Sequence, residues 1–214
     1  MIDIPGIIAN DEKLYEGSLV HYFQVVLRYG RNLNNPYHNF RHLFHVLWQC
    51  YDACRYYRAQ LEPAQMRVLL IAALLHDFDH TGHGGLGDDD LEIERALRGL
   101  RRHIATEDLN NLPRIEALMR STEYPHKKRA EDLDLSEQIL RDADLSQSLD
   151  NVWLQQTIFG LGNELNIEPE AMLHMQPEFL DKLSFTTEWG KEKFQKLIAP
   201  RKAEALRLLH LLEN

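Results

Sequence analysis

Three short clusters of histidine and aspartate carry the side chains of this chain that could do chemistry. The first lies at 37–42 (YHNFRH), where His38 and His42 are four residues apart and would project from the same face of a helix. The second lies at 76–80 (HDFDH), and the third lies at 141–145 (RDADL). None of them contains cysteine, so the ligand atoms they offer are imidazole nitrogens and carboxylate oxygens.

The 76–80 cluster directly follows the run 68–75 (VLLIAALL), which is apolar on all sides and typical of a helix buried in the centre of a bundle. Ionisable groups at the end of such a helix are unfavourable unless they are paired or bound to a metal. Nitrogen and oxygen ligands together suit octahedral divalent metals such as Mn, Fe, Mg or Co, and they can also hold Zn or Ni. A metal held in this way lowers the pKa of a bound water, so that hydroxide forms near neutral pH.

Within residues 37–148, the order His42, then His76 and Asp77, then Asp144 resembles the H…HD…D pattern of the HD superfamily of metal-dependent phosphohydrolases. The resemblance is closest to the class I cyclic nucleotide phosphodiesterases. YHNFRH resembles their Y-H-N-x-x-H motif, HDFDHTG at 76–82 is similar to H-D-x-D-H-x-G, and ADLSQS at 143–148 resembles A-D-L-S-N-P. The resemblance implies hydrolysis of a phosphate ester, with a nucleotide or cyclic nucleotide as the expected substrate.

The resemblance also implies a role for each matching residue. His42, His76, Asp77 and Asp144 would be ligands of the tighter metal, and Asp77 would bridge to a second metal held mostly by waters. One or two divalent ions are therefore expected, with the bridging water or hydroxide as the nucleophile. His38 would be the general acid that protonates the departing alkoxide, which is otherwise a poor leaving group.

Further residues are expected around this centre. Asp79 and His80 would orient ligands or waters. Residues 121–126 (STEYPH) resemble the family's A-T-D-x-x-x-H segment, which makes His126 a candidate contact to the second metal or its waters. The family's L-E-x-H-H segment is matched only weakly, by residues 100–103 (LRRH). Its glutamine-and-phenylalanine clamp for the nucleobase has no clear counterpart, and the candidates are Gln176 with Phe179 or Phe185.

Two other functions stay open at the level of sequence. Some members of the same superfamily are diiron oxygenases, and a second iron here would need extra histidines such as His80, His103 or His126. A signalling domain could keep the metal site without turnover, although the presence of His38 favours catalysis. The basic residues 127–129 (KKR) could bind a substrate phosphate, but a solvated basic turn is the commoner role of such a segment.

Helical periodicity indicates the elements that position these clusters. Apolar residues recur at i, i+3, i+4 and i+7 within 19–26, and again after the breaker at 34–36 (NNP). Two further helices are expected around 115–119 and 135–145, and no segment alternates as a strand would. The sequence predicts one all-α domain over residues 1–214, a helical bundle of the HD-domain or phosphodiesterase-like type. Its last helix carries an apolar stripe of Phe194, Leu197, Ile198, Ala205, Leu208, Leu209 and Leu212.

Composition limits the partners and the compartment. The chain has 214 residues, a formal net charge of −9 and 44% hydrophobic residues, which is typical of a globular domain. The negative charge argues against general nucleic-acid binding, because nucleic acids attract clustered Lys and Arg. No run reaches the roughly 20 apolar residues that span a bilayer, and no signal peptide is indicated. With Cys50 and Cys54 expected as buried free thiols, a cytoplasmic protein with a small phosphorylated substrate and no membrane partner is predicted, and its oligomeric state stays open.

Overall fold

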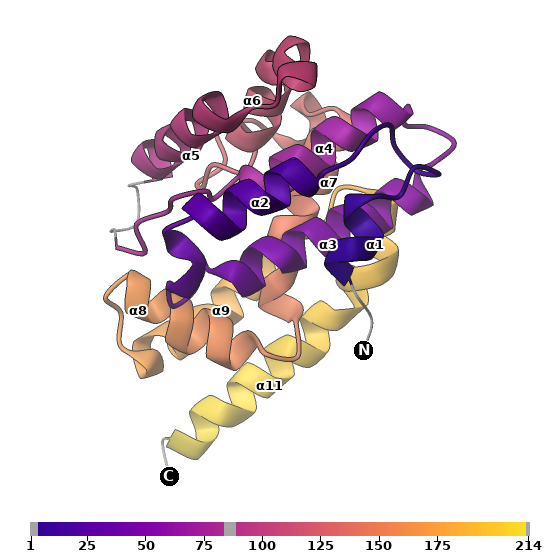
Figure 1. Cartoon of the computed structure of the whole chain (residues 1–214). Coiled ribbons are helices and arrows are strands. Elements are labelled where there is room, and N and C mark those ends of the chain that lie inside the picture. The colour runs from indigo at the N-terminus through magenta and orange to yellow at the C-terminus, as the bar shows by residue number, and fades with distance from the viewer. Residues whose placement is uncertain (1–3, 84–88, 213–214) are drawn as a thin grey trace.

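The computed structural model describes residues 4–83 and 89–212, in which helices are joined by turns (Figure 1). No strand occurs in these ranges, so the prediction of an all-α fold is confirmed. The α-helices of these ranges are α1 (Ile4–Ala9), α2 (Val20–Tyr29), α3 (Phe40–Tyr56), α4 (Pro63–Leu75), α5 (Asp89–His103), α6 (Leu112–Arg120), α7 (Leu135–Leu145), α8 (Gly162–Glu164), α9 (Pro169–Lys182), α10 (Glu188–Gly190) and α11 (Lys196–Leu212).

Helix α4 is the centre of the bundle, as its apolar sequence predicts. It begins with Pro63 after Glu62, whose side chain takes part in a capping box with Gln65. All its side chains from Met66 to Leu75 are buried, and it packs against α2, α3, α6 and α7. The HDFDH cluster therefore begins at the end of a rigid element that is surrounded by apolar side chains.

Helices α3 and α7 bring the two other clusters to α4. Asn39 caps α3, because its side chain accepts hydrogen bonds from the backbone N–H of Arg41 at 2.9 Å and of His42 at 3.2 Å. Asp134 caps α7 through a capping box. The helices expected after the breaker at 34–36, around 115–119 and over 135–145 are α3, α6 and α7. Because each cap fixes where its helix starts, it also fixes the side from which His42 or Asp144 projects.

The C-terminal part of the chain packs around a second, smaller hydrophobic cluster. Helix α11 lies where the last helix is predicted, but its apolar stripe is only partly covered. Ala205 and Leu209 are buried, whereas Leu212 is 58% exposed. Figure 1 shows the end of α11 reaching past the neighbouring helices, which explains this exposure. The cluster is formed by α9, α11 and the π-helical segment Leu154–Leu161 with its N-cap, through Trp153, Ile158, Met172, Leu173, Ala205 and Leu209.

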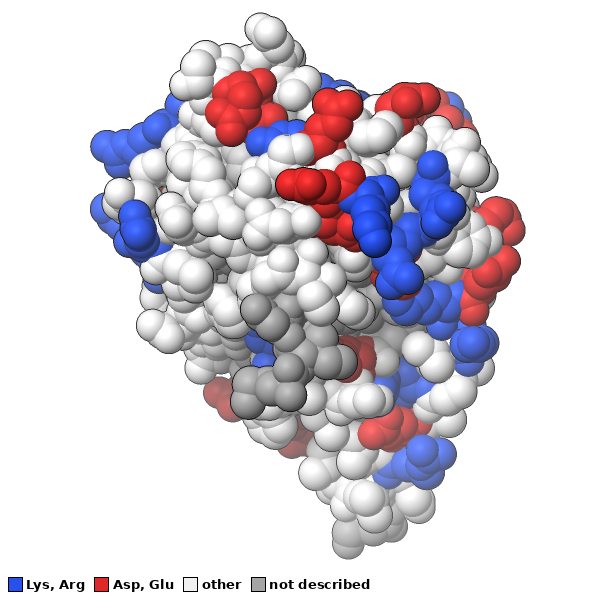
Figure 2. Space-filling view, turned by 45° about the vertical axis from the view of Figure 1, so that its right-hand side comes forward, with Lys and Arg blue, Asp and Glu red and all other residues white. Residues whose placement is uncertain are grey.

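Charges of both signs are mixed on one face of the molecule. Figure 2 shows a face on which Lys and Arg lie among Asp and Glu instead of gathering into one basic patch. Oppositely charged residues also pair between neighbouring helices, such as Arg120 with Glu94 at an N···O distance of 2.6 Å.

The two cysteines, Cys50 and Cys54, are buried free thiols, as predicted. Of the helices in the described ranges, none has the length and apolar character needed to cross a membrane.

One buried ion pair ties the N-terminal segments to the central helix. Arg67 of α4 donates from Nε and Nη2 to the two carboxylate oxygens of Asp108, both at 2.8 Å. The Tyr22 hydroxyl of α2 donates to the same carboxylate at 2.7 Å. Burial would raise the pKa of Asp108, but the hydrogen bonds from Arg67 and Tyr22 outweigh it and hold that pKa below its usual value.

We expect Asp108→Ala to lower the free energy of unfolding by about 3–5 kcal/mol, because it leaves the buried Arg67 guanidinium without its partner. Chemical denaturation near pH 7 measures this change. The double variant Arg67→Met/Asp108→Ala should be more stable than Asp108→Ala alone, since no unpaired charge stays buried. A double variant whose loss equals the sum of the two single losses would contradict this coupling.

Candidate metal centre

Four side chains from three parts of the bundle meet at the carboxyl end of α4. His42 lies in the first turn of α3, His76 and Asp77 directly follow α4, and Asp144 lies in the last turn of α7. Nε2 of His42 is 2.9 Å from Asp77 Oδ2, 3.2 Å from Asp144 Oδ1 and 3.2 Å from His76 Nε2. Nε2 of His76 is 3.0 Å from Asp77 Oδ2 and 3.9 Å from Asp144 Oδ1. The structure thus brings all four predicted ligands together.

The spacing of these atoms fits a divalent metal. Adjacent ligands of an octahedral ion with bonds of about 2.1 Å lie about 3.0 Å apart. Distances of 2.9 to 3.2 Å among the atoms of His42, His76 and Asp77 are close to that value. Both imidazoles are almost fully buried, while the side chains of Asp77 and Asp144 are 15% and 23% exposed. The cluster therefore has an open side, at its carboxylates, where water or substrate could complete the coordination.

Both imidazoles are held with Nε2 towards the cluster. Nδ1 of His76 donates to the backbone carbonyl of Ala73 at 2.9 Å, within its own helical turn. Nδ1 of His42 lies 2.5 Å from Oε1 of Gln147, which can only accept. A hydrogen bond on the other ring nitrogen is the usual support for a metal-binding histidine. The two rings are thus oriented as metal ligands.

The charges of the cluster keep one another ionised. Burial alone would lower the pKa of His42, but hydrogen bonds to Asp144 and Asp77 outweigh it and raise that pKa to about 10. Burial alone would raise the pKa of Asp77, but the neighbouring His76 and His38 hold it well below its usual value. Without metal, the His42 ring at pH 7 is consequently protonated on both nitrogens, and a metal ion must take the place of the Nε2 proton.

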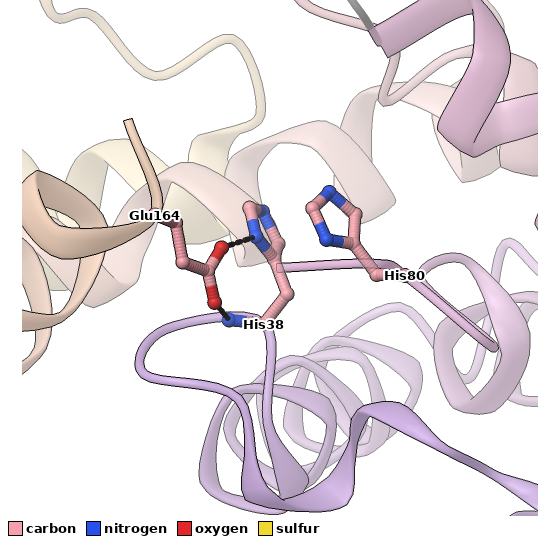
Figure 3. A group of neighbouring side chains, drawn as sticks. All are labelled: His38, His80 and Glu164. Atoms are coloured by element: carbon pink, nitrogen blue, oxygen red, sulfur yellow. Dashed lines mark hydrogen bonds and ion pairs between the residues drawn. The ribbon is translucent and has the colours of Figure 1, made fainter. Parts of the chain in front are cut away.

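His38 lies between a carboxylate and a second imidazole (Figure 3). Its Nδ1 is 2.5 Å from Oε2 of Glu164, whose other oxygen accepts from the backbone N–H of His38 at 3.0 Å and of Tyr37 at 2.8 Å. On the other side, the ring of His80 stacks on His38 with centroids 3.7 Å apart. Burial, and then the charge of His38, lower the pKa of His80 to about 4, so His80 is neutral at pH 7.

The group of His38, His80 and Glu164 offers three ligand atoms within 4.8 Å of one another. Figure 3 shows Glu164 and His80 on opposite sides of the His38 ring, so this ring lies between the carboxylate and the second imidazole. The arrangement is instead that of a histidine oriented by a carboxylate.

Asp79 and His126 lie in different surroundings. Asp79 has a positive φ of 62°, and its carboxylate accepts from the backbone N–H of Arg31 at 3.0 Å, so it fixes the turn after α4. Nδ1 of His126 donates to the carbonyl of Glu123 at 3.1 Å. Its Nε2 is buried and has no hydrogen-bond partner in the described part of the chain. His126 is therefore the better placed of the two to meet a ligand.

A cavity of about 970 Å³ opens beside the four candidate ligands. Asp77 and Asp144 line it, and α9 contributes Gln176 and Phe179 to the same lining. The alternative candidate Phe185 packs in the core, 3% exposed and with its ring centroid 5.2 Å from that of Phe194. Of the clamp candidates, Gln176 and Phe179 thus share the cavity with the cluster. The other candidate site residues that line the cavity are His38, His80, His126 and Glu164.

The basic segment 127–129 is balanced by nearby carboxylates. Lys128 pairs with Glu137 at 3.1 Å and Arg129 pairs with Asp132 at 3.0 Å, although both basic residues also border the cavity. This is the arrangement of a solvated turn.

Sequence reasoning missed two residues, Glu164 and Gln147. Glu164 is an acid inside the mostly apolar stretch 158–165 (IFGLGNEL), and this is the signal that could have found it. Gln147 is polar and uncharged, and nothing in its spacing separates it from a turn residue.

Comparison with known proteins agrees with the first two motifs. A model of the 3'5'-cyclic nucleotide phosphodiesterase family matches residues 37–84. The high affinity cGMP-specific 3',5'-cyclic phosphodiesterase 9A of Pan troglodytes is 37% identical over 67 residues, which are 30% of this chain and 11% of that protein. Its namesake from Mus musculus is also 37% identical over 67 residues, 30% and 12% of the two chains. That from Drosophila melanogaster is 34% identical over 65 residues, 29% and 4% of the two chains.

The matched segment is thus a small part of these relatives, since it covers between 4% and 12% of their length. Within it, the resemblance to the class I cyclic nucleotide phosphodiesterases is confirmed. The match includes His38, His42, His76 and Asp77 and ends well before Asp144.

We expect metal uptake near pH 7 to release at least one proton per ion, because the raised pKa of His42 keeps its ring protonated until a metal occupies Nε2, and the raised pKa of His76 adds to the release. Titration calorimetry of Mn²⁺ into chelator-treated protein, in buffers of different ionisation enthalpy, counts these protons. Affinity should fall at least tenfold for each pH unit below neutrality. Equal heats in all buffers would show that the His42 ring is already neutral at pH 7, which would contradict its raised pKa.

Proposed function

We propose that this chain is a metal-dependent phosphohydrolase that cleaves the phosphodiester of a cyclic nucleotide, and that residues 1–214 form a single HD-type domain. The observation that carries the proposal is the convergence of distant residues on one cavity. The family match covers only residues 37–84. Asp144, Glu164, Gln176 and Phe179 lie beyond it, yet they meet the matched residues at the same cavity. A chance resemblance of two motifs would not require this convergence.

His42, His76, Asp77 and Asp144 would hold the metal. When bound, a divalent ion polarises the phosphoryl oxygen and supplies hydroxide near neutral pH. The donor set admits Mn, Fe, Co, Ni or Zn, and Mg where waters complete the shell. The carboxylate of Asp77, which lines the cavity, would be the contact to a second ion.

His38 would donate the proton to the leaving oxygen. Opening a cyclic phosphodiester expels an alkoxide, which needs a proton as the P–O bond breaks. The hydrogen bond to Glu164 holds Nδ1 of His38, so that Nε2 is the nitrogen free to deliver the proton. Glu164 would also stabilise the protonated ring, because its pKa is held below its usual value by His38 despite burial.

Gln176 and Phe179 would hold the base. Gln176 is a buried residue of α9 that lines the cavity, and its Nε2 donates to the carbonyl of Met172 at 3.1 Å. Its Oε1 is therefore the atom that can accept from a base N–H group. Phe179 follows three residues later on the same helix, where its ring could stack on a purine. Since the relatives named above are cGMP-specific, cyclic GMP is the first substrate that we propose.

The diiron oxygenase is the weaker alternative. It needs further histidines at a second iron, and His103 lies elsewhere, stacked on Tyr29 with ring centroids 4.8 Å apart. His80 and His126 both line the cavity, and Nε2 of His126 has no hydrogen-bond partner in the described ranges, so these two histidines are what a second iron could use. Stoichiometric iron with oxygen consumption and no ester hydrolysis would favour it.

We expect His38→Ala to reduce the turnover of cyclic GMP by roughly 10²- to 10⁴-fold, because the alkoxide then leaves unprotonated. The same variant should lose far less activity towards bis-(p-nitrophenyl) phosphate, whose leaving group is stable without a proton. Metal content by mass spectrometry should stay close to that of the unmodified protein. Equal losses on both substrates would show that His38 does not act on the leaving group.

We expect Gln176→Ala to raise KM for cyclic GMP by about tenfold, the value of one or two lost hydrogen bonds. Turnover of bis-(p-nitrophenyl) phosphate, which has no base, should be unchanged. Steady-state kinetics with cyclic GMP, cyclic AMP and 5'-nucleotides, with and without EDTA, tests the substrate class in the same series. If linear nucleotides were preferred, or if EDTA had no effect, the proposed function would be wrong.

A further inference from the structure

Gln147 supports one of the proposed metal ligands. It lies in the 3-10 turn Ser146–Leu149, directly after α7, and is fully buried. Its Oε1 contacts Nδ1 of His42 at 2.5 Å, across 105 residues of sequence. Where the motif A-D-L-S-N-P has asparagine, this chain has the longer glutamine.

The direction of this hydrogen bond determines which nitrogen of His42 faces the cluster. A carboxamide oxygen only accepts, so Nδ1 carries a proton and Nε2 can present its lone pair to a metal. If the amide were reversed, its N–H would point at Nδ1, and the proton of a neutral ring would lie on Nε2. That nitrogen is 2.9 Å from Oδ2 of Asp77, where the metal is to bind. The observed orientation is the one that permits coordination.

The same orientation is unfavourable for Gln147 itself. Its Nε2 is buried and has no hydrogen-bond partner in the ranges that the structure describes. A buried N–H group without a partner destabilises the folded state. The side-chain amide of Gln147 therefore satisfies the Nδ1–H of His42 and leaves its own N–H group without a partner.

His42 depends on a side chain in a way that His76 does not. Nδ1 of His76 donates to the backbone carbonyl of Ala73, a partner that no substitution removes. For His42 the corresponding partner is the Gln147 side chain. A substitution at Gln147 can thus free the His42 ring to rotate while the His76 ring keeps its hydrogen bond.

The neighbouring contact holds the turn but is not a second active site. Oγ of Ser146 lies 2.8 Å from Nε2 of His45, whose Nδ1 is 3.5 Å from Asp150. This resembles the grouping of a serine nucleophile, yet Ser146 is 1% exposed and its hydroxyl donates to the carbonyl of Ala143 at 2.6 Å. The turn is therefore attached to α3 at both His42 and His45.

We propose that Gln147 is a positioning residue that fixes the tautomer of His42 and thereby sets the affinity of the metal centre. The inference rests on the proposed function only in taking His42 as a metal ligand. A neutral amide orients the ring without adding a third carboxylate to Asp77 and Asp144. Gln147 thus orients the imidazole of His42 without adding a charge to the cluster.

The test compares Gln147→Met with Gln147→Glu in the whole chain. Methionine fills similar space without an acceptor, and glutamate keeps the acceptor. We expect Gln147→Met to weaken Co²⁺ binding roughly 10- to 100-fold in a chelator competition, and Gln147→Glu to retain most of the affinity. In the zinc-loaded protein, ¹⁵N-edited NMR should show a protected Nδ1–H of His42 that Gln147→Met loses.

Gln156→Met is the matched control, because Gln156 is a buried glutamine of the π-helical segment with an unpaired Oε1. It should leave Co²⁺ affinity unchanged. Thermal unfolding of the metal-free proteins should show that Gln147→Met remains folded at the assay temperature, because the His42 N–H that it leaves without an acceptor is offset in part by the loss of the unpaired Nε2 of Gln147. Unaltered Co²⁺ affinity in Gln147→Met would overturn the inference. These measurements use no substrate, so tight metal binding without hydrolysis would overturn the proposed function alone.

Discussion

The structure depends on placing two carboxylates beside two imidazoles, with N···O distances of 2.9 to 3.9 Å, at the buried end of an apolar helix. Such a group is unfavourable in a core unless opposite charges or a metal compensate it. Here protonated His42 balances part of the charge of Asp77 and Asp144, and the proposed metal would replace its proton. Most of the other polar features near the site follow from this need, because each ligand must be held in one orientation.

Two kinds of support meet that need. The caps of α3 and α7 set the helix positions, and hydrogen bonds to Ala73 and Gln147 orient the rings. A second histidine is oriented in the same way, because Glu164 holds Nδ1 of His38, the proposed proton donor. Both groups border the same cavity, to which the first contributes Asp77 and Asp144 and the second contributes His38 and Glu164.

Much of this could be predicted from the sequence, for physical reasons. The burial of α4 follows from a run without a polar face. Ionisable residues within apolar segments indicate the clusters at 76–80 and 141–145, and the choice of the four candidate ligands comes from the resemblance to the HD superfamily. Glu164 and Gln147 could not be assigned, because their importance comes from contacts across more than a hundred residues. The exposure of Leu212 was missed for a similar reason, since periodicity shows that a stripe exists but not how far its partner extends.

The separation of the ligands along the chain has a consequence for how the protein matures. His42 and its partner Gln147 are 105 residues apart, so no short segment can assemble the site. Metal affinity then appears only once the bundle has closed, and free metal favours the closed state by mass action. If the four side chains bind metal as proposed, an incompletely folded chain would lack the centre. The available metal would then favour the completely folded chain, and the proposed hydrolysis would depend on complete folding.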